Sequence, residues 1–140
     1  MKINEGEQFM PQVGKKMNTV QFNYYLNGEL INVKYCTGDK KFMLESGAEL
    51  IPYNLDSIVG QSECIITEGE MDCLSFIEIG KNNCVSVPNG ANSNLSYLDD
   101  FIEGFFGDKE TIYIAVDTDT KGLLLRDELI RRFGGERCRI

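Results

Sequence analysis

Short apolar runs alternate with helix-like stretches over the second half of the chain, and this alternation limits the fold more than any other feature. The apolar runs are CIITE, CVSVP, TIYIAVD and ERCRI, and the stretches between them include MDCLSFIEIG, LSYLDDFIEGFF and KGLLLRDELIRRFGG. In the last of these, Leu125, Leu129 and Phe133 recur every four residues, as on one face of a helix. Strands that alternate with helices form a parallel sheet with right-handed crossovers. The sequence therefore predicts an α/β domain with a parallel sheet of about four strands flanked by helices.

The residues before this domain have a pattern that is typical of antiparallel β-structure. TVQFNYYL and ELINVKYC flank Asn27-Gly28, a dipeptide whose positive φ angles suit the type I′ turn of a hairpin. A third short strand is expected in KKFMLESG, after a turn at residues 37–39. The α/β domain is therefore preceded by a small antiparallel β-rich subdomain.

These patterns divide the chain into three expected regions. Residues 1–18, rich in Lys, Gln, Asn and Gly, are expected to be a flexible lead-in. Residues 19–60 form the β-rich subdomain, and residues 61–140 the α/β domain, with a loop at NGANSN. Since the sequence stops within the last expected strand, we expect a fragment that is truncated at its C-terminus.

The composition excludes several kinds of chemistry. The chain has no histidine, which excludes imidazole zinc sites and histidine bases. Its five cysteines are odd in number and never spaced as C-x-x-C. The first ten residues lack a signal-peptide pattern, and no apolar run approaches the roughly 18 residues of a membrane span. We therefore expect a cytoplasmic protein without membrane contact, whose catalysis would use carboxylates, lysine, tyrosine, cysteine or a bound metal.

The net charge of −8 is concentrated in the middle of the chain. Residues 61–110 hold ten Asp and Glu residues against two Lys and Arg residues. A protein that binds nucleic acid by bulk charge alone would not have this distribution. The acidic segment favours a functional unit that includes a cation.

Carboxylates follow two of the expected strands at the point where each strand ends. Glu68 follows CIIT, while Asp117 and Asp119 follow TIYIAV and project to the same side of an extended backbone. If the first strand lies between the second and third, these ends meet at the switch point of the sheet, where ligands bind. Two like charges about 4 Å apart repel by roughly 4 kcal/mol at an effective dielectric near 20, so protonation or a cation must offset them. Oxygen ligands alone select magnesium, manganese or calcium, and Gly122 would allow a tight turn behind the pair.

Two other interpretations of these acids remain open. Acidic residues at strand ends also solvate loops or favour helix N-termini, and this description suits Glu70 and Asp72. Alternatively, Asp117, Asp119, Gly122 and Glu128 occupy the first, third, sixth and twelfth positions of an EF-hand calcium loop. The strand-like residues before this segment, and a lysine where the fifth-position ligand is needed, disfavour the EF-hand.

EGEMD followed by DTDTKG resembles the E-G-x-x-D and D-x-D-x-x-G signatures of the TOPRIM domain, which primases, topoisomerases, recombination mediators and certain nucleases share. IITEGEMDCLS is most similar to the primase half of phage-type and mitochondrial-type primase-helicases. The paired motifs cover the segment from Cys64 to Ile140. The resemblance therefore implies a TOPRIM fold and the RNA polymerase core of a DNA primase.

The resemblance also implies roles for individual residues. Glu68 matches a glutamate that acts as general acid/base or metal ligand, and Asp117 and Asp119 match the metal-binding aspartates. Three further residues match supporting positions of the motifs, namely Asp72, Gly69 and Gly122. Lys121 departs from the pattern, because primases often carry a small residue there; it would contact phosphate or point outward.

The upstream segment VKYCTGDKKF resembles a basic strand-turn-strand in the β-containing subdomain of bacterial-type primases. By this likeness Lys34 and Lys40 would contact the template or the incoming nucleotide, with Lys41 beside them. The alternative is that these lysines lie on a solvated hairpin edge and prevent pairing with other sheets.

The implied function is nucleotidyl transfer in DNA replication, making RNA primers from ribonucleoside triphosphates on single-stranded DNA. Mg²⁺ or Mn²⁺ held by Asp117 and Asp119, with a second ion shared with Glu68, would serve this chemistry. Because the sequence has neither C-x-x-C pairs nor a P-loop, zinc-binding and helicase modules would lie elsewhere in the full-length protein or act in trans. A TOPRIM nuclease, a non-catalytic docking domain and, more remotely, a receiver-like regulatory domain are the alternatives.

Overall fold

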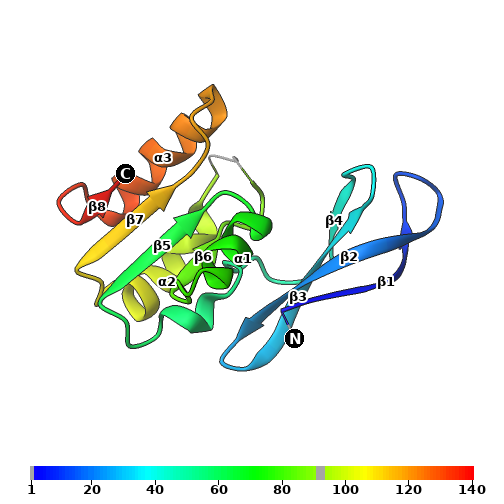
Figure 1. Cartoon of the computed structure of the whole chain (residues 1–140), viewed down its shortest axis with the longest axis horizontal. Coiled ribbons are helices and arrows are strands. Elements are labelled where there is room, and N and C mark those ends of the chain that lie inside the picture. Colours follow the sequence, from blue (N-terminus) through cyan, green and yellow to red (C-terminus); the bar gives the residue numbers. More distant parts are fainter. Residues whose placement is uncertain (1, 91–93) are drawn as a thin grey trace. The chain divides into compact units, whose positions relative to one another are not determined.

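The computed structural model describes residues 2–90 and 94–140, and the chain divides into two compact units (Figure 1). The N-terminal unit comprises Met1–Leu50 and the C-terminal unit Ile51–Ile140. Residues 91–93 of the expected loop NGANSN lie outside the described residues.

The N-terminal unit is a four-stranded antiparallel sheet with the strand order β1-β2-β3-β4. Its strands are β1 (Ile3–Met10), β2 (Lys15–Leu26), β3 (Glu29–Thr37) and β4 (Phe42–Leu44). Asn27 and Gly28 connect β2 to β3 with φ angles of 52° and 79°, as a type I′ turn requires. The hairpin and the third short strand predicted from the sequence are therefore confirmed.

Residues 1–18 differ from the expected flexible lead-in, because most of them belong to the sheet. β1 pairs with β2 from Ile3 opposite Phe22 to Met10 opposite Lys15. Met10 is fully buried, and Asn4 exchanges side-chain hydrogen bonds with Gln21 and Asn23 at 3.1 and 2.9 Å. Asn4, one of the polar residues that indicated a flexible segment, thus finds its partners on the neighbouring strand β2, which composition alone does not reveal.

The C-terminal unit contains a four-stranded parallel sheet with the order β6-β5-β7-β8. Its strands are β5 (Glu63–Thr67), β6 (Cys84–Ser86), β7 (Thr111–Ala115) and β8 (Cys138–Arg139). The first strand of the unit therefore lies between the second and third, which is the order assumed above. Thr67 at the end of β5 is paired with Ala115 at the end of β7. The loops that follow the two strands therefore begin at the same edge of the sheet.

Two regular helices connect these strands. Helix α1 (Glu70–Glu78) follows β5, and helix α3 (Thr120–Phe133) follows β7. Leu125, Leu129 and Phe133 of α3 are buried, which confirms the predicted apolar face. A 3₁₀ turn at Leu55–Ile58 precedes the sheet, and Tyr53 beside it forms an antiparallel bridge to Ser86 of β6.

The predicted helix LSYLDDFIEGFF is broken into three short pieces. A 3₁₀ turn (Ser96–Leu98) leads into α2 (Asp99–Phe101) and then into a π-helical turn (Ile102–Phe106). Phe101 and Phe106 are both buried although they are five residues apart, and the wider π turn brings such a pair to one face. Core packing of the two rings therefore overrides the regular α-helical spacing.

Among the described residues, no helix has the length and apolarity needed to cross a membrane. None of the five cysteines, all of which the structure describes, is in a disulfide; Cys36 is half-buried, and the other four are buried. The four cysteines of the C-terminal unit therefore act as small core residues.

Candidate functional site

The end of β5 positions the first acidic motif. Thr67 is fully buried, and its hydroxyl lies 3.1 Å from the Gly69 carbonyl oxygen and 3.2 Å from that of Val85, which fixes the turn. Gly69 is the N-cap of α1 and has an extended backbone, with φ −132°. A Cβ atom on Gly69 would meet Asp72 Oδ2 at 3.4 Å, an ordinary contact, so glycine is not demanded here by backbone strain. Glu68 thus precedes the helix, and Asp72 lies in its first turn.

The end of β7 positions the second motif around Gly122. Asp119 is the N-cap of α3, and its Oδ1 accepts a 2.7 Å hydrogen bond from the Gly122 amide. A Cβ atom on Gly122 would stand 2.0 Å from the Asp117 carbonyl oxygen. Gly122 is therefore required for close approach of two backbone segments, rather than for the tight turn expected from the sequence.

A hydrogen bond joins the two motifs. The Asp117 amide donates to Glu68 Oε1 at 3.3 Å, although the residues are 49 positions apart in the sequence. The pairing of β5 with β7 makes this contact possible, because both loops leave the sheet at the same edge. The structure thus brings Glu68 to Asp117, as the sequence predicted.

Burial and like charges shift the pKa values of two of these carboxyl groups. The pKa of Glu68 is raised mainly by burial and further by Asp117, Asp119 and Asp72, against the hydrogen bond from the Asp117 amide. The pKa of Asp72 is raised by burial and then by Asp117, against a hydrogen bond from the Gly69 amide. The four acidic residues therefore share one electrostatic environment in which each added negative charge is unfavourable.

The carboxylates of Glu68, Asp72, Asp117 and Asp119 are not arranged as a complete set of metal ligands. Within residues 2–90 and 94–140, no three acidic or thiol side chains are arranged so that they could hold a metal ion. Asp119 uses one oxygen to cap α3, and a carboxylate retains a second oxygen for another partner. The donor set nevertheless fits a hard divalent cation, because it consists of oxygens and because a cation would relieve the repulsion around Glu68. The predicted metal ligands therefore remain a prediction.

Glu70 is the acidic residue whose environment sequence reasoning missed. We interpreted it as an acid that solvates a loop or favours a helix start, yet only 4% of it is exposed. Glutamate is rarely buried to this extent. Its place in the first turn of α1 agrees with the helix-start interpretation, since the helix dipole favours a carboxylate there, but no sequence pattern indicated its burial.

The EF-hand alternative is wrong. The candidate loop begins after strand β7 rather than after a helix, and its twelfth residue, Glu128, lies within α3. Glu128 accepts hydrogen bonds from Arg131 at 2.7 and 2.9 Å and from Arg132 at 2.9 Å. These contacts occupy the carboxylate that would have to bind calcium.

The predicted basic residues lie in two places. Lys34, on β3, is 9% exposed, and its Nζ lies 5.0 Å from the centroid of the Phe42 ring. Lys40 and Lys41 are exposed in the turn between β3 and β4, where Lys41 forms a 3.4 Å ion pair with Asp39. Because β4 is an edge strand, protection of that edge remains an alternative role for these lysines.

Lys121 belongs to the C-terminal unit together with the acidic motifs. It is exposed in the first turn of α3, one residue before Gly122. Both roles considered for it, a phosphate contact or an outward position, are compatible with this exposure.

This chain is similar in sequence to a protein family and to two plant proteins. A family model described as Toprim-like matches residues 65–140. The Primase homolog protein of Arabidopsis thaliana is 39% identical over 132 residues, covering 85% of this chain and 39% of the relative. The Twinkle homolog protein, chloroplastic/mitochondrial, of the same plant is 38% identical over 136 residues, covering 85% of this chain and 19% of the relative. The chain thus spans less than half the length of either relative.

Solved structures show the same fold at lower sequence identity. The primase fragment of the bacteriophage T7 primase-helicase protein has a TM-score of 0.78 and 21% identity, covering 96% of this chain and 55% of that chain. A DNA primase domain from Pseudomonas aeruginosa has a TM-score of 0.67 and 20% identity, and the match covers 95% of this chain and 47% of that chain. The matched family model, together with the parallel sheet and its paired acidic motifs, shows that this chain belongs to the Toprim-like family.

Proposed function

We propose that the chain is the catalytic core of a DNA primase, which makes RNA primers from ribonucleoside triphosphates on single-stranded DNA. The observation that carries this proposal is the hydrogen bond from the Asp117 amide to Glu68, in a site where burial and neighbouring carboxylates raise the pKa of Glu68. It links the two TOPRIM motifs at the carboxyl edge of a parallel sheet, where ligands of such sheets bind. The name of one relative, a primase homolog, and the primase names of the structures with the same fold support it.

The acidic residues would divide the work of nucleotidyl transfer. Asp117 and Asp119, with Glu68, would hold magnesium or manganese, which when bound supplies positive charge for the triphosphate and its leaving pyrophosphate. A carboxyl group with a raised pKa is better matched to proton exchange near neutral pH, so Glu68 would accept the proton of the attacking 3′-hydroxyl at one of its carboxylate oxygens. Asp72 would raise the local negative charge and so strengthen cation binding.

The basic residues would contact phosphates. Lys34, Lys40 and Lys41 would attract the template backbone or the incoming nucleotide, and Lys121 would contact phosphate beside the acidic site. In one solved structure with this fold, primase domains of two bacteriophage T7 subunits are bound to an RNA/DNA hybrid and dTTP and interact with the lagging-strand DNA polymerase. Zinc-binding and helicase modules are proposed to complete the protein, either in the same polypeptide or in trans.

The cytoplasmic location expected from the sequence also stays a prediction. The name of the Twinkle homolog relative places that protein in chloroplasts and mitochondria.

Primer extension tests the proposal without requiring template recognition. A short RNA annealed to a DNA template would be incubated with the chain, the four ribonucleoside triphosphates and Mg²⁺ or Mn²⁺. We expect extension that is lost in Glu68→Gln and Asp117→Asn and kept in Glu128→Gln, whose carboxylate bonds to arginines.

Two results would replace the proposal. Cleavage of single-stranded DNA without nucleotides would assign the carboxylates to a nuclease, in which water is the nucleophile. Tight DNA binding with neither extension nor cleavage, unchanged in Glu68→Gln, would assign a docking role.

A further inference from the structure

An exposed aromatic ring lies among the lysines of the N-terminal unit. Phe42 is 51% exposed on β4, the edge strand of the sheet. The Lys34 ammonium lies 5.0 Å from its ring centroid, within the range of a cation–π interaction. Lys40 and Lys41 directly precede Phe42 and are exposed. An aromatic ring thus stands among three cations in a chain whose net charge is −8.

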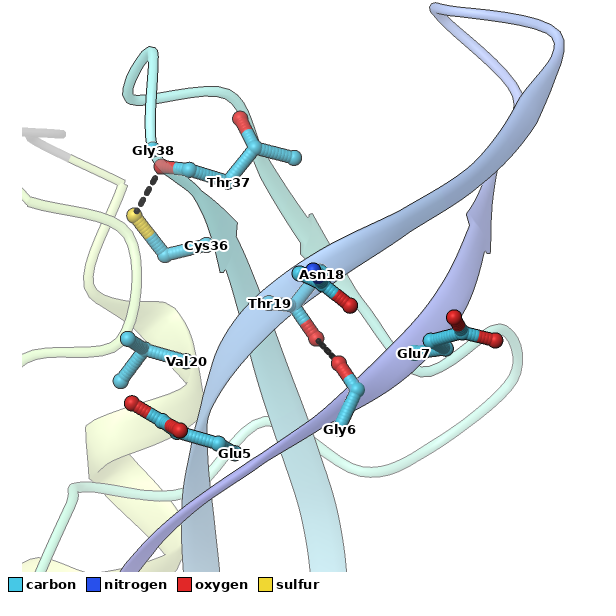
Figure 2. Close-up of a pocket in the computed structure, with 9 residues that line it drawn as sticks. All are labelled: Glu5, Gly6, Glu7, Asn18, Thr19, Val20, Cys36, Thr37 and Gly38. Atoms are coloured by element: carbon cyan, nitrogen blue, oxygen red, sulfur yellow. Dashed lines mark hydrogen bonds between the residues drawn. The ribbon is translucent and has the colours of Figure 1, made fainter.

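The strand register extends this surface from Phe42 across the sheet. Phe42 is opposite Cys36, Cys36 is opposite Val20, and Val20 is opposite Glu5, so the four side chains lie in one row on one face. Cys36, Val20 and Glu5 line a hollow of about 550 Å³, and Figure 2 shows the three side chains projecting from the same side of the sheet. The exposed ring therefore lies in the same row of side chains as three residues that line this hollow, although Phe42 itself is not part of its lining.

This combination matches the way in which proteins hold single-stranded nucleic acid. Such sites pair cations, which attract the phosphate backbone, with aromatic rings on which bases stack. A protein partner with a neutral apolar surface would gain little from the flanking lysines. A polyanion with flat apolar bases would use both the ring and the charges.

We propose that Phe42 is a stacking platform for a base of single-stranded DNA, and that the neighbouring nucleotide lies over Cys36 and Val20 in the adjoining hollow. That this strand is the template of primer synthesis rests on the function proposed above. The stacking of a base on Phe42 would add an aromatic contact to those of the lysines. A DNA-binding measurement can test this contact without any measurement of primer synthesis.

Cys36 provides a direct reporter of occupancy. It is half-buried and adjacent to Phe42 in the register, whereas the other four cysteines are buried, so a small alkylating reagent should modify Cys36 first. Mass spectrometry would follow this modification with and without a twelve-nucleotide oligothymidylate. The matched ligand is a twelve-unit abasic strand, which carries the same phosphates but no bases.

We expect the oligothymidylate to slow Cys36 modification several-fold and the abasic strand to protect it much less. Phe42→Ala should weaken oligothymidylate binding about fivefold, measured by fluorescence anisotropy, and leave abasic binding unchanged. Phe42→Trp should keep the preference for bases, whereas Phe42→Leu should lose it. Phe9→Ala is the matched control, because Phe9 is 49% exposed on β1 of the same sheet.

Two outcomes would overturn the stacking role. One is equal affinity of the wild type and Phe42→Ala for oligothymidylate; the other is an equal loss in Phe9→Ala. If either occurs while Glu68-dependent primer extension persists, the stacking role fails and the primase proposal stands. If base-dependent protection of Cys36 persists without extension, stacking stands and the catalytic assignment fails.

Discussion

Glu68 and Glu128 are glutamates of the same unit in opposite electrostatic surroundings. On α3, Arg131 and Arg132 donate hydrogen bonds to Glu128 and lower its pKa to about 2. At the end of β5, burial together with Asp117, Asp119 and Asp72 raises the pKa of Glu68. The protein thus pairs one carboxylate with cations of its own and places the other among further carboxylates.

The difference in pKa shift between the two glutamates distinguishes a structural ion-pair network around Glu128 from a candidate functional site around Glu68. Arg132 also forms an ion pair with Asp99 of α2, so the arginine network ties α2 to α3. The carboxylates at the ends of β5 and β7 repel one another, and a bound cation would turn this repulsion into affinity. Perturbed carboxyl groups of this kind are concentrated at functional sites.

The largest effect on stability is expected from a substitution at Gly122, where the backbone of α3 closely approaches the Asp117 carbonyl group. Gly122→Ala would place a Cβ atom 2.0 Å from the Asp117 carbonyl oxygen, so backbone must move. We expect a loss of about 3 kcal/mol in the free energy of unfolding, measured by urea denaturation. Gly104→Ala, where a Cβ would meet nothing within 4 Å, should leave stability nearly unchanged. Equal stability of the two variants would contradict the assigned role of Gly122.

A smaller effect of opposite sign is expected at Glu68. Its pKa in the folded protein lies above the ordinary value of 4.5, so its ionised form destabilises the fold at pH 7. Glu68→Gln should therefore stabilise the protein at pH 7 by about 0.5–1 kcal/mol, a rise of a few degrees in melting temperature. This advantage should shrink as the pH falls through the raised pKa and vanish below about pH 4, where Glu68 is protonated in both states.

The control for this variant lies at the other end of the same strand. Glu63→Gln removes the same charge at the start of β5 and should not reproduce the stabilisation. A fall in melting temperature on Glu68→Gln without added metal would contradict the repulsive environment.

The smallest effect is expected at the paired glutamate. Glu128→Gln should lower stability at pH 7 by less than about 1 kcal/mol, because ion pairs that stay in contact with solvent contribute little, and both pairs of Glu128 are only partly buried. Since the folded pKa of Glu128 is depressed, its contribution is present above the ordinary value of 4.5 and is lost as the pH falls toward about 2. Thermal melts at pH 7, 4 and 2 would follow this loss, with Asp127→Asn as a neighbouring charge control. A difference between Glu128→Gln and wild type that grows with acidity would exclude the arginine pairing.

The sequence predicted the parts of the fold that depend on local patterns. The Asn27-Gly28 turn and the apolar face of α3 follow from short-range rules, and alternating strands and helices indicated the parallel sheet. The strand order that brings Glu68 to Asp117 was predicted by assuming a common topology.

Features that depend on tertiary contacts were not predictable in this way. Residues 1–18 were misjudged because Asn4 finds its partners on β2, and the π-helical turn forms because two phenylalanine rings share one core. The steric demand at Gly122 depends on a carbonyl group five residues earlier that folds back against it. At the site, the sequence indicated that Glu68 and Asp117 would meet, but not that Asp119 would cap α3 or that Glu70 would be buried.

A titration with Mg²⁺ and Mn²⁺, followed by melting temperature and by NMR of backbone amides, tests the central claim most directly. We predict that the ions raise the melting temperature of the wild type and shift amides around Glu68, Asp117 and Asp119. Both responses should be lost in Asp117→Asn/Asp119→Asn, in which asparagine can still cap α3, and kept in Glu128→Gln. An equal response of the wild type and the double variant, or no response in either, would contradict the claim that these strand-end carboxylates form a divalent cation site.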